Sequence, residues 1–273
     1  MKQNQFLLIG LGVALLFVGA AFVILSPSPE ERLAQAVSEG RWSDVEQQAQ
    51  VELEKTQDVE KQADFYDLLG RAYREQGKNR LAFDAYMAAS ERRTSEPELR
   101  RRAAIELVKV GHKKSERGEP EAGIETYREA IELAPLIPQG HRALVAALRE
   151  QYNLEEAIVA LEAAMQTIPQ DVKLRLQLAW LLGSHPDPDI RNPYRAVELA
   201  NDILLHDRTP ETLDTFAVAL ASAGDFKQAI RFELDAIDLA GGEEAPLFED
   251  RRKRVGRFLK DEPYIEQPAP ITP

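Results

Sequence analysis

The sequence predicts an all-α protein in which pairs of helices repeat along the chain. The stretches EAGIETYREAIELAP and EEAIVALEAAMQTIP begin 34 residues apart, at Glu121 and Glu155, and they restate one order of side-chain sizes. Each places a small residue, a large apolar residue and a second small residue at helical spacing, which is typical of a helix face that packs closely against a neighbour. Each then ends in proline, which cannot continue a helix. Strand-like alternation is scarce after residue 29, so we expect helical hairpins and no sheet.

The N-terminal segment is predicted to be a membrane anchor. A tail of residues 1–5 precedes residues 6–25, FLLIGLGVALLFVGAAFVIL, which are twenty apolar residues without a charge. As a helix they would span about 30 Å, the thickness of the hydrocarbon core of a bilayer. A cleaved signal peptide is the alternative, with VGA at residues 18–20 as its cleavage site, but the apolar run continues to Leu25. Lys2 favours a cytoplasmic N-terminus, which places the rest of the chain outside the cytoplasmic membrane.

The segment after the anchor is predicted to be a break followed by an irregular pair of helices. Residues 26–29, SPSP, are expected to be stiff and extended, because each proline keeps the residue before it out of the helical region. Residues 30–62 are interpreted as a degenerate helical pair with Gly40 at its turn and Val45 and Ala49 at the small positions. We therefore expect the repeat array to begin in this pair.

The array proper covers residues 63–240. Its unit from Ala63 has a characteristic order of large and small residues, namely Tyr66, Leu69-Gly70, Tyr73, Ala82, Tyr86 and Ala89. This order resembles that of the tetratricopeptide repeat (TPR), a helix-turn-helix unit of 34 residues. Units are expected near residues 63–96, 104–137, 138–171, 172–208 and 210–241. The resemblance implies an α-solenoid, a right-handed superhelix of stacked hairpins.

Two units depart from the family pattern. The fourth unit carries about five extra residues in the turn SHPDPDIRNP, where three prolines predict a stiff, non-helical loop. The fifth unit has Glu233 at the position where the family places an aromatic residue. We interpret that unit as degenerate at this position.

The C-terminal part is predicted to close the array. Residues 246–262 are expected to form a polar capping helix, because the last repeat would otherwise expose an apolar face. Their basic run Arg251-Arg252-Lys253-Arg254 is interpreted as a solvated helix face. Residues 263–273, PYIEQPAPITP, are expected to be extended. We favour a frayed end for this tail over the alternative, in which it docks on a partner or on the array itself.

Composition and motifs argue against several classes of function. The formal net charge is −12, and an acidic surface repels phosphate backbones, so we expect no nucleic-acid partner. The chain has no cysteine, and its four histidines are scattered without the spacing of metal ligands. No nucleophile or phosphate-binding motif is present in the sequence. We therefore expect a protein that is not an enzyme, with no catalytic residue, metal site, cofactor or small-molecule substrate.

The TPR resemblance also implies a binding surface. In that family the first helix of each unit lines a concave groove that accepts a peptide or a helix. The family's groove positions fall in this sequence on polar and aromatic residues, namely Asp67, Arg71, Arg74, His112, Arg142, Arg149 and Trp180. The alternative is that the arginines pair with nearby acids on the surface and that Trp180 belongs to the core. The lysine- and asparagine-rich clamp known in this family is not reproduced, so we do not expect recognition of a Glu-Glu-Val-Asp tail.

These features together indicate a membrane-anchored adaptor or scaffold. The groove would bind a segment of a membrane or secreted protein during assembly, folding or secretion of an envelope complex. The layout is similar to that of bacterial single-span TPR proteins, which implies the inner membrane, an N-terminus inside and a periplasmic array. The alternative is a permanent structural subunit of a larger membrane complex or a self-assembling oligomer.

Overall fold

The computed structural model describes residues 27–267, and within this range every regular element is a helix. The prediction of an all-α helical repeat fold is confirmed. No helix in the described range is long and apolar enough to cross a membrane. The predicted anchor at residues 6–25 lies outside that range. The chain divides into two compact units, one ending at Ala103 and one beginning at Ala104, and each is described by itself.

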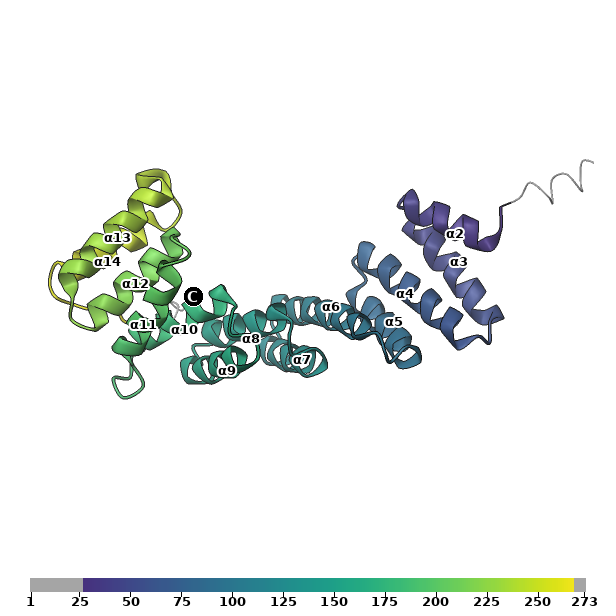
Figure 1. The fold of residues 1–273 in the computed structure, drawn as a ribbon, viewed down its shortest axis with the longest axis horizontal. Helices are drawn as coiled ribbons and strands as arrows, with labels where there is room; N and C mark the ends of the chain where they lie inside the picture. The colour runs from purple at the N-terminus through teal and green to yellow at the C-terminus, as the bar shows by residue number, and fades with distance from the viewer. Residues whose placement is uncertain (1–26, 268–273) are drawn as a thin grey trace, which may run out of the picture. The chain divides into compact units, whose positions relative to one another are not determined.

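The first unit consists of two helical hairpins and the start of a long helix (Figure 1). Its helices are α2 (Pro29–Ser38), α3 (Trp42–Lys55), α4 (Val59–Glu75), α5 (Asn79–Arg92) and the first part of α6 (Pro97–Glu116). The array begins with a capping box, in which the Ser28 side chain accepts a bond from the backbone of Glu31 and the Glu31 side chain accepts one from Ser28. The predicted extended break at residues 26–29 is therefore wrong for Pro29, which is the first residue of the helix because its fixed φ and missing N–H suit that position.

The second unit continues the same alternation of helices. Its elements are the rest of α6, α7 (Pro120–Leu133), α8 (Pro138–Glu150), α9 (Leu154–Thr167), α10 (Val172–Ser184), α11 (Pro193–Leu204), α12 (Pro210–Ser222), α13 (Phe226–Ala240), the short 3₁₀-helix η1 (Gly242–Glu244) and α14 (Phe248–Phe258). Helices α7, α8, α11 and α12 begin with proline, whose missing N–H costs nothing in the first turn of a helix. The SHPDPDIRNP segment separates α10 from α11.

Close approach between the helices of a hairpin depends on glycine. A Cβ atom added to Gly70 on α4 would lie 2.5 Å from the ring of Tyr86 on α5. A Cβ atom added to Gly111 on α6 would lie 2.4 Å from the ring of Tyr127 on α7. Both pairs are sixteen residues apart, so one contact recurs in two hairpins. The repeated pattern of side-chain sizes therefore reflects a tyrosine ring that packs directly against the backbone of a glycine on the partner helix.

The end of the array holds a buried cluster of charges on α12, α13 and α14. Glu233 is 0% exposed and accepts a bond from Arg254 Nε at 3.0 Å. Asp214 accepts a bond from Arg254 Nη2 at 2.5 Å, and its other oxygen lies 3.5 Å from Arg251 Nε. Burial raises the pKa of Glu233 to about 9, and the nearby Asp214 carboxyl acts in the same direction.

The interpretation of the basic run on α14 as a solvated face is wrong for two of its members. Arg251 is 2% exposed and Arg254 is 7% exposed, whereas Arg252 and Lys253 face solvent. The physical reason is that the buried carboxyl groups of Asp214 and Glu233 accept bonds from Arg254, and Asp214 also lies beside Arg251. The acid at the aromatic position of the fifth unit is therefore paired with the capping helix, which lies beside α13 (Figure 1).

Candidate functional site

The tail after α14 folds back onto the second unit. Asp261 has a φ of 57°, a left-handed conformation that turns the chain after the helix. Arg257 Nε then donates to the carbonyl of Pro263 at 3.3 Å. The described tail segment, residues 263–267, has no regular secondary structure and contacts α8 and α10. The favoured interpretation of this segment as a frayed end is wrong, because its side chains and backbone are held.

Glu266 is the most firmly held residue of the tail. Its Oε1 accepts a bond from Arg149 Nη2 at 2.8 Å, and its Oε2 accepts one from Trp180 Nε1 at 2.7 Å. Its backbone N–H donates to the carbonyl of Ser184 at 2.8 Å, and its own carbonyl accepts from the hydroxyl of Tyr152 at 3.2 Å. The side chain is only 14% exposed. Four groups thus hold the carboxylate of Glu266 together with its backbone N–H and carbonyl.

Tyr264 provides an aromatic contact beside this carboxylate. Its ring centroid lies 5.5 Å from that of Trp180, with the two planes tilted by 54°. The guanidinium of Arg254 lies 5.4 Å from the Trp180 ring and 5.6 Å from the Tyr264 ring, within the range of cation–π attraction. Burial raises the pKa of the Tyr264 hydroxyl, so it stays neutral. We call Arg149, Tyr152, Trp180, Ser184 and Arg254 the tail site.

Tyr152 has an unusual backbone in this site. Four other hairpin turns in the described chain carry glycine with positive φ, namely Gly40, Gly77, Gly118 and Gly224. Tyr152 follows Gly118 by one period of 34 residues and takes the same conformation, with φ at 57°. A bulky residue in this region is strained, and such strain collects at functional sites. The strained residue is also the one whose hydroxyl bonds the tail.

A second hollow of the same unit lies between the first helices of two hairpins. It has a volume of about 300 Å³ and is lined from α6 and α8 by residues that include His112, Ala146 and Glu150. His112 is exposed, and its Nδ1 lies 2.9 Å from the hydroxyl of Tyr127. This hollow offers an imidazole and a carboxylate beside small side chains.

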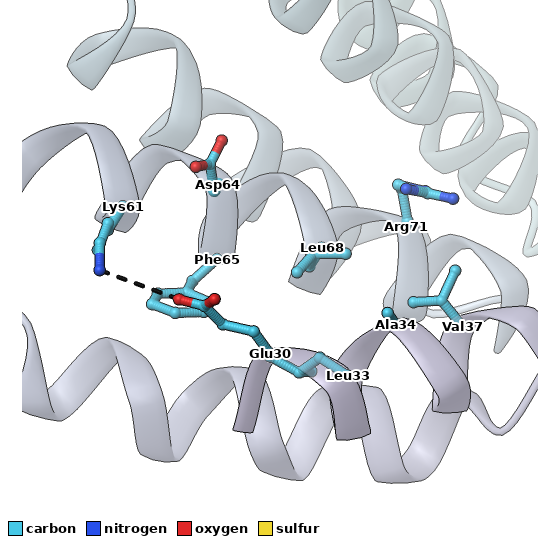
Figure 2. Close-up of a pocket in the computed structure, with 9 residues that line it drawn as sticks. All are labelled: Glu30, Leu33, Ala34, Val37, Lys61, Asp64, Phe65, Leu68 and Arg71. Carbon is cyan, nitrogen blue, oxygen red and sulfur yellow. Dashed lines mark ion pairs between the residues drawn. The ribbon is translucent and has the colours of Figure 1, made fainter. Parts of the chain in front are cut away.

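The first unit has its own pocket, of about 420 Å³, between α2 and α4 (Figure 2). Its apolar lining comes from both helices, namely Leu33, Ala34, Val37, Phe65 and Leu68. At one end Lys61 Nζ lies 4.0 Å from Glu30 Oε1, and at the other end Arg71 lies beside the apolar residues of α2 (Figure 2). Within residues 27–267 Arg71 has no hydrogen bond or ion pair. An apolar floor with one free cation suits a ligand that is both apolar and acidic.

The remaining groove positions proposed from the sequence are occupied by internal pairs. Asp67 accepts a bond from Arg102 at 2.7 Å, and Arg74 donates to the adjacent Glu75 at 2.7 Å. Arg142 grips the buried carboxylate of Asp171 through Nε and Nη2, at 3.3 and 2.5 Å. That carboxylate also caps the N-terminus of α10. At these three positions the structure therefore shows ion pairs within the protein, which was the alternative to a role in binding a peptide.

The structure therefore brings together only Arg149 and Trp180 of the proposed positions, on the carboxylate of Glu266. Sequence reasoning missed the other half of this site, namely Tyr152, Ser184, Arg254, Tyr264 and Glu266. Only Tyr152 left a signal, because it stands where a period of 34 residues places glycine. No group of three or more His, Cys, Asp or Glu residues that could hold a metal occurs in the described part of the chain. What the site can do chemically is hold a carboxylate and an aromatic ring.

Solved structures show the fold class. The chain is similar to YrrB, described as a TPR protein with an unusual peptide-binding site, at 15% identity and a TM-score of 0.51, over 75% of this chain and 97% of that one. It is similar to yeast Tom70 at 14% identity and a TM-score of 0.50, over 80% of this chain and 47% of that one. No protein-family model and no curated sequence matches the chain. The fold is that of a TPR-type helical repeat protein.

Proposed function

We propose that this protein is an adaptor that binds a segment of another protein on the first helices of its hairpins. The observation that carries the proposal is the tail itself. A stretch of polypeptide without regular structure lies on α8 and α10, held through its backbone, a carboxylate and an aromatic ring. A surface that holds its own chain in this way has the donors and the aromatic anchor that recognition of a foreign segment requires.

The structural neighbours support the same class of function. The description of YrrB names a peptide-binding site on a TPR fold, and this chain covers nearly all of that protein at a TM-score of 0.51. The pocket on α2 and α4 and the hollow on α6 and α8 also lie on first helices, where that fold offers its groove. A helical repeat of this kind supplies a preformed surface, and we infer a scaffold without catalytic chemistry.

The proposed setting is the bacterial inner membrane. The apolar residues 6–25 would anchor the chain as a single span, with the helical array in the periplasm. Tethering raises the effective concentration of the array near membrane-bound partners without any new contact. The partner would be a membrane or secreted protein whose segment is captured during assembly, folding or secretion of an envelope complex.

Photo-crosslinking in cells tests the adaptor function. A crosslinking amino acid is placed at Arg71 in the first pocket or at Ala146 in the hollow of the second unit, because both lie on first helices. Val159 is the matched control, since it is exposed on the second helix α9 and lines none of these hollows. We expect one defined protein to be captured from Arg71 or Ala146 and not from Val159. Capture from Val159 alone would contradict the proposal.

Purification in mild detergent separates the adaptor from its alternative. A permanent subunit would retain a companion in fixed stoichiometry, because obligate interfaces are large and apolar. An adaptor would be recovered without a companion and would bind it again on addition. A stoichiometric companion that resists dissociation would favour the structural subunit.

A further inference from the structure

We propose that the tail is a built-in competitor in a site whose external ligand is a segment with an aromatic residue two positions before a glutamate. The inference rests on the proposed adaptor function and names the ligand class of one of its surfaces. The partner segment would replace residues 263–267 on the tail site and meet the same five residues. Release of the tail would accompany binding of the partner.

The motif follows from where the two tail side chains meet the site. The ring of Tyr264 and the carboxylate of Glu266 both contact Trp180, one through ring packing and one through Nε1. Side chains at positions i and i+2 share a side in an extended segment, so the site reads one face of such a chain. Each oxygen of the carboxylate accepts a bond from one donor, Arg149 Nη2 or Trp180 Nε1. A glutamine amide in its place would face one of these donors with its own NH₂ group, which cannot accept a bond.

The contacts to the tail backbone would allow the site to bind any segment that carries the aromatic residue and the glutamate, whatever its other side chains. The carbonyl of Ser184 accepts from the backbone N–H of Glu266, and the hydroxyl of Tyr152 donates to its backbone carbonyl, so neither contact depends on a side chain of the bound segment. Tyr152 has a strained left-handed backbone at a turn position where four other hairpins have glycine. Glycine would adopt this backbone conformation without strain, so the contribution particular to tyrosine is its side chain, whose hydroxyl bonds the tail.

The tail is held in a manner that a partner can overcome. Arg149 Nε is buried and has no hydrogen-bond acceptor, although the neighbouring Nη2 is bonded to Glu266. A ligand that accepts bonds from both Nε and Nη2 of Arg149 would bind better than the tail does. The tail has the advantage of its tether, because a short linker gives an effective concentration on the order of millimolar. A free segment must therefore bind well to displace it.

A peptide titration tests the competition on the full chain in detergent. The probe is a fluorescein-labelled peptide, EPYIEQPAPITP, with the sequence of residues 262–273, and its control replaces the glutamate of the YIE motif by glutamine. The proteins are the wild type and a full-length double variant, Tyr264→Ala with Glu266→Gln, whose tail no longer fills the site. We expect the probe to bind the double variant at least ~10-fold more tightly than the wild type. The glutamine peptide should bind the double variant at least ~10-fold more weakly than the probe.

A further substitution separates binding from mere structure. Tyr152→Gly, added to the double variant, gives the turn the residue that four other hairpins have at this position. We expect its urea midpoint to rise, because the strain is relieved, while its affinity for the probe falls several-fold. A purely structural tyrosine would instead lower the midpoint or leave the affinity unchanged.

The outcomes that overturn the inference are distinct from those that overturn the adaptor function. Equal affinity of the probe for the wild type and the folded double variant, or equal binding of the two peptides, would exclude a tail that competes through its carboxylate. If the double variant loses its circular dichroism spectrum, Glu266→Gln alone serves in its place, because it keeps the packing of Tyr264. Capture of a partner from Arg71 or Ala146 in cells would leave the adaptor function standing in either case.

Discussion

Gly70 and Gly111 set how closely the helices of two hairpins approach. The nearest atoms to a Cβ at these positions are carbons of a tyrosine ring, and both rings are buried. A buried ring has no room to move away from an added Cβ atom, unlike the flexible end of an exposed lysine side chain. Each glycine therefore gives up helix propensity, roughly 0.5–1 kcal/mol, to allow a contact that alanine would prevent.

Alanine at Gly70 or Gly111 is expected to destabilise the protein. The overpacking costs about 1–3 kcal/mol, which exceeds the gain in helix propensity. Gly256→Ala on α14 is the matched control, because no atom lies within 4 Å of the added Cβ, and it should stabilise by roughly 0.5–1 kcal/mol. Urea unfolding followed by circular dichroism measures all three variants. A stabilised Gly70→Ala variant would show that the ring moves freely.

Glu233 makes the stability of the second unit depend on pH. Burial is the main cause that raises its pKa to about 9, Asp214 adds to it, and Arg254 opposes it. A folded pKa above the unfolded value means that the unfolded chain releases this proton first as the pH rises. The contribution of Glu233 is therefore complete below about pH 4.5, its ordinary pKa, and is lost as the pH rises through about 9.

The Glu233→Gln variant tests this dependence. Glutamine keeps an acceptor for Arg254 and has no proton to lose. We expect its melting temperature, relative to the wild type, to rise steadily between pH 5 and pH 9. The difference between the two proteins isolates Glu233, because every other titrating group is shared. A constant difference over this range would mean that Glu233 is already ionised near neutral pH.

At the scale of the elements, α14 is held to the array by one face of its basic run. Arg254 bonds both Glu233 and Asp214 and lies over the rings of Trp180 and Tyr264. Phe258, one turn further on, is fully buried. The capping helix therefore joins the end of the array to the tail site, and the loss of Arg254 should affect both.

Arg254→Ala and Arg252→Ala compare the two faces of this helix. Removal of one partner from a buried charge pair costs about 3–5 kcal/mol, and we expect the lower end because Arg251 remains beside Asp214. Arg252 is exposed and, among residues 27–267, bonds only Glu249, so its loss should change stability by less than about 1 kcal/mol. Urea unfolding gives both values. Equal losses would mean that α14 is not anchored through its inner face.

The helical elements could be predicted from the sequence because their packing leaves a periodic record. The pair of Gly111 and Tyr127 repeats the pair of Gly70 and Tyr86 at the same sequence separation, and proline starts four helices of the second unit. The tail left no such record. Glu266 contacts Arg149 although 117 residues separate them, and no sequence pattern links a glutamate at one position to an arginine at the other. The pair of Glu233 and Arg254 was hidden for the same reason, since its two halves lie on different helices with unrelated patterns.

At the scale of the whole molecule, a repeat protein is stabilised by contacts between neighbouring helices. In the described chain the principal contacts join helices that are adjacent or next but one in sequence, such as α10 with α11 and with α12. The tail is the exception, because it returns from α14 to α8 and α10. Binding of a partner at the tail site would therefore displace the segment that directly follows the capping helix α14, and so would affect the C-terminal end of the array.

The proposed topology can be tested on the whole chain. Alkaline phosphatase, which is active only outside the cytoplasm, is fused after Pro273. We expect high activity, because the Lys/Arg bias of residues 1–5 favours a cytoplasmic N-terminus and long following domains translocate regardless of their charge. Deletion of residues 6–25 should abolish that activity while leaving the fusion protein detectable, since no other stretch of the sequence has twenty uncharged apolar residues. Activity that survives the deletion would show that residues 6–25 are not what carries the array across the membrane. A fusion active only with a cytoplasmic reporter would place the array on the cytoplasmic side and change the set of partners that the tail site can meet.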